Sequence, residues 1–582
     1  MLKALLFLLC GLTTVTASAD SDEHCPGFQA GEKRLLWGDL HVHTSYSLDA
    51  YAFGVRHTGA EAFSFGRGQP LLERDGKSQI VIDRPLDFMA VTDHAESFAV
   101  IYLCTDPATS NTPYCQAIRE QSHPATAWNI FRNYLLPLIT PSQPTQPAPL
   151  CGPGQENCEQ AAIWQWQRAQ REANAANDPC DFTAFVAQEW SATPGAAHIH
   201  RNLIFRTESV PDKAFDYLTY NSPEKLWRAL QTHCTPEADC DVLAIPHNSN
   251  LAEGLGFDVE HADNQSLKLR AHYERLLEVH QSKGSSECLP ISWTDDSGDC
   301  GFERVLSRET QQALAKQRQE AEQAWQSLRS GYARSLLERG LVAYDKSGDA
   351  RINPLQLGLI GSTDTHVAAP GFVAEDTWRG DAFGWGGAEE RFQRITYNPG
   401  GLVAVWAEEN TRDAIFKSLW DREAYATSGP RIGLRVFADD ENKARCSSAD
   451  ASAIGGVPMG GVLPDNESGS MWLTVIAQRD KTPLQRIEVI KGSLINGQVE
   501  EQVIDIANSK KGRKNWCVSW QDLNYQADVP AFWYVRVLEK PTPRWSKRDC
   551  EKADLCKKYP EADIAIQERA WSSPIWNHPG HN

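Results

Sequence analysis

Short apolar runs recur along the first three quarters of the chain, and each run breaks off abruptly into polar residues. Runs of this length, separated by helices or insertions, are typical of buried strands in a mostly parallel sheet or barrel. In α/β barrels the active site gathers at the carboxyl ends of the strands. The runs and their polar ends are RLLWGDLHVHT (34–44), PLDFMAVTDHAE (85–96), DFTAFVAQEW (181–190), RNLIFRT (201–207), DVLAIPHNSN (241–250), RLLEVHQSKG (275–284) and LQLGLIGSTDTH (355–366).

The pattern changes after about residue 432. Short alternating runs such as LRVFA, MWLTVIAQ, RIEVIKG and FWYVRVLE follow, separated by Gly, Pro and Asn. This alternation predicts an antiparallel, sandwich-like β domain over 433–582. A chain of 582 residues is also too long for one ordinary core. We therefore predict an α/β domain over 20–432 followed by a smaller β domain.

The segment from about 104 to 180 interrupts the α/β pattern. It contains PSQPTQPAPLCGPGQENC, which is too rich in Pro to form a regular core element. We interpret it as an irregular surface insertion with one helix at 159–176, and its position suggests a lid over the site. Further helices are expected at 303–329 and up to about Arg339, where Gly340 would end the second helix.

The first 19 residues have the features of a secretory signal peptide. Lys3 provides the positive charge, an apolar run follows to about Leu12, and Ala17-Ser18-Ala19 fits the cleavage pattern. The run is too short to span a bilayer. We expect cleavage after about Ala19, no transmembrane segment, and a periplasmic or extracellular protein.

Cysteine usage agrees with export. The sequence has 15 cysteines, and removal of Cys10 with the signal peptide leaves an even number in a compartment where disulfides persist. Sequence alone does not fix their connectivity, so the following pairs are hypotheses. They are Cys104 with Cys115, Cys151 with Cys158, Cys234 with Cys240, Cys288 with Cys300, Cys550 with Cys556, Cys446 with Cys517, and Cys25 with Cys180 by elimination.

The net charge of −19 argues against nucleic acid as the main partner, because an acidic surface repels a phosphate backbone. No dinucleotide-binding fingerprint, P-loop or nucleophile elbow is present. We instead expect a small-molecule, anionic substrate. The sequence does not indicate the oligomeric state.

The polar ends of the strands carry metal-ligand chemistry. His41 and His43 are two residues apart, so on a strand both imidazoles point to the same face and can reach one ion. A carboxylate such as Glu189 at the end of a buried strand is costly unless it is paired or bound to a metal. His and carboxylate ligands without Cys suit zinc, manganese or iron(II). The candidates outnumber the ligands of one tetrahedral ion, which indicates two or three ions.

The ordered series HVH, TDH, an isolated strand-end Glu, PHN, EVH and STDTH resembles the motifs of the PHP (polymerase and histidinol phosphatase) superfamily. It is most similar to a secreted bacterial branch of that superfamily. The resemblance spans about 40–366 and continues through AYATSGPRI. It implies a distorted (β/α)7 barrel with a trinuclear metal site at its mouth. It also implies phosphoester hydrolysis as the commonest activity.

The resemblance also implies roles for individual residues. Glu189 matches the carboxylate that bridges two ions. A further His is expected after it, and His200 is preferred over His198. Glu278 and His280 match a motif that often reads Glu-x-Asn, so they are placed as site-lining residues. The remaining expected ligands are His41, His43, Asp49, His94, His247, Asp364 and His366.

The sequence therefore predicts a metal-dependent hydrolase, most simply a phosphoesterase that uses a metal-activated water. The alternatives are hydrolysis of a C–N or C–O bond and a non-catalytic binding protein with a structural metal site. The predicted catalytic residues are Glu189, Asp364 and Glu278. The predicted substrate-binding residues are His280, Lys283, Arg201 and Arg431.

Overall fold

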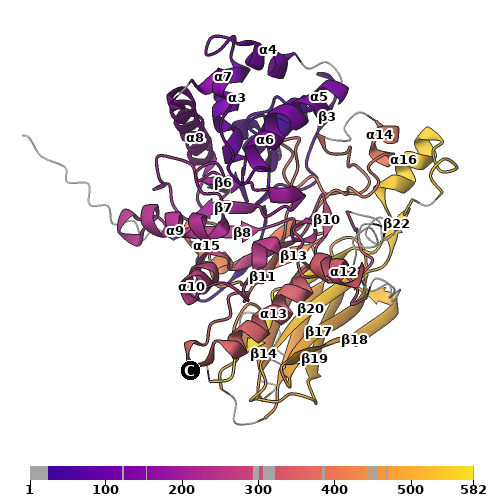
Figure 1. Cartoon of the computed structure of the whole chain (residues 1–582). Helices are drawn as coiled ribbons and strands as arrows, with labels where there is room; N and C mark the ends of the chain where they lie inside the picture. Colours follow the sequence, from indigo (N-terminus) through magenta and orange to yellow (C-terminus); the bar gives the residue numbers. More distant parts are fainter. Residues whose placement is uncertain are drawn as a thin grey trace, which may run out of the picture.

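The computed structural model shows a mixed α/β protein with a large mixed sheet and several smaller sheets, and its long C-terminal strands lie at the bottom of the view in Figure 1. It describes the chain from residue 24 to residue 580, and the predicted signal peptide lies outside this part. No helix in the described part is both long and apolar enough to cross a bilayer. The described ranges are 24–120, 124–152, 154–292, 300–305, 313, 321–382, 387–441, 446, 455–465, 469–560 and 562–580.

A ten-stranded mixed sheet is the largest element, with β24 pairing beside its main path. Two smaller sheets, β6-β7-β8 and β10-β9-β11, have three strands each. In order along the sheet, the ten strands are β18 (Gln498–Arg513), β17 (Leu484–Ile495), β20 (Ala531–Glu539), β23 (Arg569–Ser572), β13 (Ala424–Thr427), β12 (Leu402–Ala407), β1 (Arg34–Asp39), β4 (Phe88–Ala90) and β5 (Thr183–Phe185), with β24 (Ile575–Asn577).

The mixture of helices and strands confirms the predicted α/β class. The described strands do not close into a single hydrogen-bonded barrel, so the predicted barrel is not confirmed. The sheets meet through single bridges, at His94 with Glu189 and at Val42 with Thr365, and not through continuous ladders. The strands of the two smaller sheets are β6 (Ala187–Trp190), β7 (Arg201–Phe205), β8 (Val242–Pro246), β9 (Leu276–Gln281), β10 (Gly284–Ser285) and β11 (Gly358–Gly361).

Parallel pairing brings the carboxyl ends of several strands together. β1 pairs in parallel with β4, β4 with β5, and β9 with β11. The bridges at residues 42 and 94 lie just beyond the ends of β1 and β4. The predicted convergence of the polar strand ends is therefore confirmed, although a closed barrel does not produce it.

The insertion at 104–180 is mostly helical, which corrects the expectation of an irregular segment. Its prolines occupy positions that helices tolerate: Pro113 lies in the first turn of α4, and Pro137 lies at the start of α6. Residues 141–147 of the proline-rich stretch are not helical, as expected, and the helices lie before or after them. The helices are α4 (Pro113–Arg119), α5 (Pro124–Ile130), the π-helix η2 (Phe131–Leu135), α6 (Leu136–Ile139), α7 (Ala148–Cys151) and α8 (Glu156–Ala176), which includes the predicted helix at 159–176.

The expected end of a helix at Gly340 is wrong. Helix α13 (Ala333–Lys346) continues past this glycine. A Cβ at position 340 would lie 2.6 Å from Asn353 Oδ1. Close approach of another segment, and not a helix cap, therefore explains the glycine. Of the helix expected at 303–329, the structure describes α12 (Ala321–Arg329). Residues 303–305 are not helical, since Arg304 forms an isolated bridge with Gly284. Residues 306–312 and 314–320 lie outside the described part of the chain.

All seven predicted disulfides are present. The pair Cys25–Cys180 joins residues 155 positions apart, and Cys104–Cys115 and Cys151–Cys158 close small loops inside the insertion. The others are Cys234–Cys240, Cys288–Cys300, Cys446–Cys517 and Cys550–Cys556. So many disulfides indicate an oxidising environment such as the periplasm or the extracellular space.

The C-terminal region is antiparallel β structure, as its alternation predicts. A four-stranded sheet contains β14 (Gly433–Asp439), β15 (Val457–Pro458), β16 (Trp472–Gln478) and β19 (Asn515–Gln521). The long strands β17, β18 and β20 extend the large sheet on the same side of the molecule (Figure 1). Because β13 pairs with β23, one sheet crosses the proposed boundary at residue 432. The division into two domains stays a prediction.

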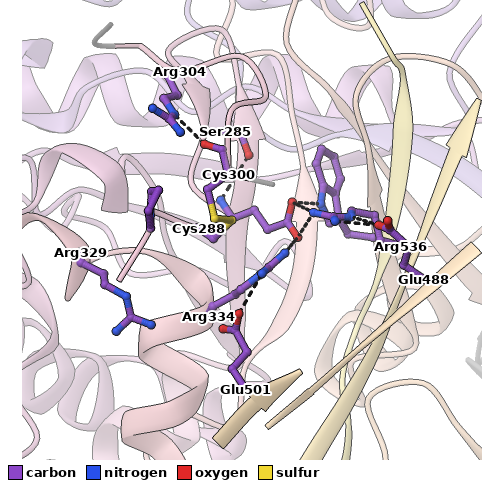
Figure 2. The surroundings of a disulfide bond; sticks show 12 residues. Ser285, Cys288, Cys300, Arg304, Arg329, Arg334, Glu488, Glu501 and Arg536 are labelled. Atoms are coloured by element: carbon purple, nitrogen blue, oxygen red, sulfur yellow. Dashed lines mark hydrogen bonds and ion pairs between the residues drawn. A yellow bond between two sulfur atoms is a disulfide. The ribbon is translucent and has the colours of Figure 1, made fainter. Parts of the chain in front are cut away.

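A buried ionic network ties the C-terminal strands to the rest of the protein. Glu287, just after β10, accepts hydrogen bonds at 2.9 Å from Arg334 of α13 and from Arg536 of β20. Figure 2 shows Arg334 also reaching Glu501, and Arg536 also reaching Glu488, beside the disulfide Cys288–Cys300. These contacts hold helix, loop and sheet in one arrangement.

Candidate metal centre

Histidine and carboxylate side chains from successive strand ends meet in one buried cluster. His41 and His43 follow β1, with the core residue Val42 pointing the other way between them. The other members lie within β6, follow the ends of β4, β8 and β11, immediately precede β7, or lie on the short helix α1 (Leu48–Ala52). They are His94, Glu189, His247, Asp364, His366, His200 and Asp49, and all of them are buried.

Glu189 lies at the middle of the cluster. Its Oε1 lies 2.6 Å from His200 Nδ1 and 3.2 Å from His247 Nε2. Its Oε2 lies 3.2 Å from His43 Nε2 and 3.1 Å from His94 Nδ1. One carboxylate therefore faces imidazoles on both of its oxygens, which is the arrangement expected of a bridging ligand.

Asp364 occupies a second central position. Its Oδ1 lies 3.1 Å from His41 Nε2 and 3.2 Å from His43 Nε2, and its Oδ2 contacts Lys283 Nζ. The backbone of Asp364 is left-handed, with φ of 50°. This conformation is uncommon for a residue other than glycine and occurs often at functional sites. Here it belongs to the residue that directs a carboxylate into the cluster just after β11 ends.

Asp49 closes the opposite side of the cluster. Its Oδ2 lies 3.1 Å from His94 Nε2 and 3.2 Å from His366 Nε2. The same oxygen thus approaches two imidazoles from different strand ends. The structure therefore brings all nine residues predicted as ligands into one cluster.

The ligand atoms form sets that could each hold a metal ion. The atoms within each set lie within 4.8 Å of one another. The sets share His41, His43, His247 and Glu189, as neighbouring ions in a multinuclear site would require. They are His41 with His43 and Glu189, Glu189 with His200 and His247, His43 with His94 and His366, and His41 with His247 and Glu278.

The bonding of the cluster fits bound cations. Among the described residues, Glu189 Oε2 and Asp364 Oδ1 are buried oxygens that lie near imidazole nitrogens but have no hydrogen-bond partner. In addition, His41 Nε2 and His43 Nε2 point at each other across 3.1 Å. Unsatisfied buried oxygens are costly, and two ring nitrogens at this distance compete for one proton. A cation between these atoms would satisfy both requirements.

The electrostatics of the cluster are those of paired imidazoles and carboxylates. Burial alone would lower the pKa of His94, but Glu189 and Asp49 outweigh it and raise this pKa well above its usual range. Burial alone would raise the pKa of Glu189, but the surrounding imidazoles hold it well below its usual range. Despite burial, nearby carboxylates raise the pKa of His366 to about 10. Metal uptake must therefore displace protons.

A cavity of about 340 Å³ opens onto the cluster. All nine predicted ligands line it, as do Lys283, His198 and Tyr397, and part of the insertion forms the facing wall. His198 is stacked against His200 with ring centroids 5.1 Å apart, but it belongs to none of the metal-sized sets. This placement favours His200 over His198 as the ligand.

Three of the predicted substrate-binding residues are not brought to this cavity. Arg201 is fully buried and donates to Glu274 at 2.8 Å, because it points to the opposite side of β7 from His200. Arg431 donates to two backbone carbonyls in the segment before β4. His280 packs against the rings of Phe302 and Trp571. Of the four, Lys283 alone lines the cavity.

A family model described as "Protein of unknown function (DUF3604)" matches residues 30–516 and 508–579, which is most of the chain. The chain belongs to the DUF3604 family. Comparisons with curated proteins and with solved structures returned no match. The part of the chain that matches the DUF3604 model includes every residue of the cluster.

The cluster of this DUF3604 protein is supported by hydroxyl groups that the motifs did not indicate. Ser47 Oγ lies 2.9 Å from His43 Nδ1, and Ser191 Oγ lies 2.6 Å from His94 Nδ1. Thr193 Oγ1 lies 2.8 Å from His200 Nε2. Such partners fix the orientation of ligand rings. Each lies near a motif in sequence, so a search for Ser and Thr beside the motifs would have found them.

Glu278 contacts the ring of His41 on the side that faces away from the cluster. Both of its oxygens lie 3.1 Å from His41 Nδ1, while His41 Nε2 faces the cluster. We expect Glu278→Gln in this DUF3604 protein to weaken metal affinity by about tenfold to a hundredfold, because the charge that orients and polarises the ring is lost. Titration against a competing chelator measures this change.

The same titration separates support from direct coordination. If Glu278 only supports His41, the variant regains the full number of ions at high metal concentration. Loss of one ion even at saturation would instead make Glu278 a ligand, and an unchanged affinity would contradict both roles. Glu260→Gln, in a partly exposed pair with Arg339, is the control.

Proposed function

We propose that the protein is a metal-dependent hydrolase that cleaves phosphoesters at a centre of two or three divalent ions. The observation that carries the proposal is the convergence of nine buried ligands around Glu189, whose Oε2 has no hydrogen-bond partner in the described part of the chain. The motif series that resembles the PHP superfamily supports the same conclusion.

The residues divide into holders of the ions and residues that face the substrate. His41, His43, Glu189 and Asp364 would hold the central ions, and the imidazole-rich set around Asp49 would hold a further ion. When bound, such ions lower the pKa of water and neutralise charge on a phosphoryl group. Zinc, manganese and iron(II) suit this mixture of imidazole and carboxylate ligands.

Lys283 is placed to help bind an anion. Its side chain reaches the cavity, and its Nζ contacts Asp364 at the edge of the cluster. Asp364 raises its pKa above the usual range even though burial lowers it, so the ammonium group stays charged. Charged Lys283 can therefore hold a phosphoryl oxygen beside the ions, which is positioning and not covalent chemistry.

Hydrolysis of a C–O or C–N bond is the second candidate. Among the described residues that line the cavity, Lys283 alone is a lysine or arginine, and it is already paired with Asp364. Because the site has so little unpaired positive charge, a substrate without a negative charge could also bind there. The metal centre and its holders are the same in both proposals.

The test is metal analysis of periplasmic protein, with hydrolysis assays before and after chelation. We expect two or three transition ions per chain and phosphoester cleavage that chelation removes and added metal restores. Bound ions without phosphoester cleavage, but with ester or amide cleavage, would favour the second candidate. Bound ions without any cleavage would favour a binding protein. Phosphoester cleavage that survives complete metal removal would contradict the proposal.

A further inference from the structure

The cavity at the metal centre has two chemically different walls. The inner wall is the ligand cluster. The outer wall comes from α5, η2 and α6 of the disulfide-stapled insertion, which contribute Trp128, Phe131, Leu135, Leu136 and Ile139. Leu135 and Ile139 are fixed parts of the fold, because they are 2% and 6% exposed, and the other three are partly buried.

Trp128, in the apolar wall, is held in place by neighbouring side chains. Trp128 packs edge-on against Phe53, with ring centroids 5.1 Å apart, and against Phe131, with centroids 5.5 Å apart. The Arg394 guanidinium lies 4.7 Å from the centre of the Trp128 ring. An aromatic side chain packed on several sides is a preformed surface, so a ligand can bind it without first ordering it.

A π-helical turn shapes this wall. Proline has no N–H for the helical ladder and crowds the turn before it, so Pro137 accounts for the widening of the helix at Phe131–Leu135. Turns of this kind are rare and are frequent at functional sites. Both ends of the turn, Phe131 and Leu135, line the cavity.

The wall carries few hydrogen-bonding side-chain groups. Among the cavity-lining residues between 128 and 140, these groups are the indole N–H of Trp128 and the hydroxyl of Thr140, and that hydroxyl donates to Leu136 O at 2.7 Å. A sugar or nucleoside would leave most of its hydroxyl groups unpaired against such a surface, which is costly. An aromatic ring or a branched alkyl group would instead bury apolar surface there.

We propose that the enzyme selects esters in which an aromatic or branched alkyl group lies directly beside the reacting group. This inference rests on the proposed hydrolase function and assigns its substrate class. The reacting group faces the ions and Lys283, and the apolar group lies against Trp128, Phe131 and Leu135. A cavity of about 340 Å³ is at the small end of ligand sites, so the apolar group is compact.

The experiment measures binding and not turnover, so it does not depend on which bond is cleaved. Metal-loaded protein is titrated calorimetrically with two matched pairs of compounds. Methylphosphonate and phenylphosphonate carry a phosphoryl-like anion, and acetohydroxamate and benzohydroxamate carry a general metal-binding group. We expect the phenyl member of each pair to bind at least about tenfold tighter, because it buries a ring against the wall.

Variants then locate the preference. Trp128→Ala and Leu135→Ala should reduce the phenyl preference to about threefold or less, while the affinities of the methyl compounds stay the same. Trp164→Ala is the matched control, because Trp164 lies on α8 of the same insertion, is 45% exposed and does not line the cavity. Circular dichroism and metal content confirm that each variant is folded and loaded.

The outcomes separate this inference from the proposed function. A phenyl preference among the hydroxamates, without phosphonate binding, supports the apolar wall and argues against phosphoesters. Equal binding of methyl and phenyl compounds in both pairs overturns the inference, even if chelator-sensitive phosphoester cleavage stands. A preference that persists in Trp128→Ala and Leu135→Ala also overturns it, because the ring then binds elsewhere.

Discussion

Replacement of Glu189 by glutamine is expected to remove at least one ion from the centre and to lower hydrolysis at least about a thousandfold. The carboxylate faces four imidazoles, with His200 and His247 on one oxygen and His43 and His94 on the other. Glutamine keeps the size of the side chain, but it offers one neutral oxygen and an N–H₂ group that repels a cation. The change therefore isolates the negative charge and the second oxygen.

Metal content by mass spectrometry and initial rates at saturating metal are the two measurements. Glu96→Gln is the matched control, because Glu96 is also fully buried near the cluster. Its Oε1 accepts hydrogen bonds from the backbone N–H groups of Ser191 and Tyr217, and a glutamine oxygen can accept them as well. If Glu189→Gln keeps its full metal content and rate, the central role of Glu189 is wrong.

Part of the ligand cluster could be predicted because its geometry is local, whereas Asp49 and His200 were assigned through the resemblance to the PHP motifs. Two side chains that are two residues apart on a strand share a face, which joins His41 with His43 before any fold is known. A carboxylate at the end of a buried run, such as Glu189, is equally conspicuous because burial of an unpaired charge is costly. Parallel strands then bring separate ends together. Each step uses a short stretch of sequence and one rule.

The same alternation should have excluded Arg201. It follows His200 directly on the entry to β7, so the two side chains point to opposite sides, and Arg201 pairs with Glu274 in the core. Nearness in sequence to a ligand was a poor guide. Arg431 also lies away from the cavity, because its side chain donates hydrogen bonds to backbone carbonyls before β4.

Features that depend on distant segments were not predictable in this way. Whether strands close into a barrel depends on ladders between segments far apart, and the bridge between His94 and Glu189 is a single contact. The apolar wall was hidden because the proline-rich stretch that begins at Pro141 led us to interpret the whole insertion as irregular, although the helices of the wall end just before it. The position of the insertion suggested a lid, but its chemistry emerged only from the packing of Trp128 and Leu135.

The second large effect is expected from a change in the ionic network that attaches the C-terminal strands to the rest of the protein. We expect Glu287→Gln to lower the free energy of unfolding by about 3–5 kcal/mol, the usual cost of removing one partner from a buried ion pair. Glu287 accepts hydrogen bonds from Arg334, Arg536, Tyr534 and Trp571, and it is 3% exposed. The neutral variant leaves both guanidinium groups buried with less compensating charge.

Urea titration, followed by tryptophan fluorescence with the disulfides intact, measures this loss. Glu389→Gln removes an ion pair with Lys558 in which both side chains are 55% exposed, and should cost at most about 1 kcal/mol. Equal losses in the two variants would show that the buried network does not hold the C-terminal strands. An unchanged metal content in both variants would separate this effect from the metal centre.

The pH dependence of the Glu287→Gln effect has a defined sign. Burial alone would raise the pKa of Glu287, but Arg536 and Arg334 outweigh it and hold this pKa well below the usual value of 4.5. The stabilisation by its charge is therefore fully present above about pH 4.5 and is lost as the pH falls towards the lowered pKa. The difference in the free energy of unfolding between the wild type and Glu287→Gln should be constant from about pH 5 to about pH 7, and it should shrink at lower pH. A difference that grows in acid would mean that the variant acts by altered packing and not by loss of charge.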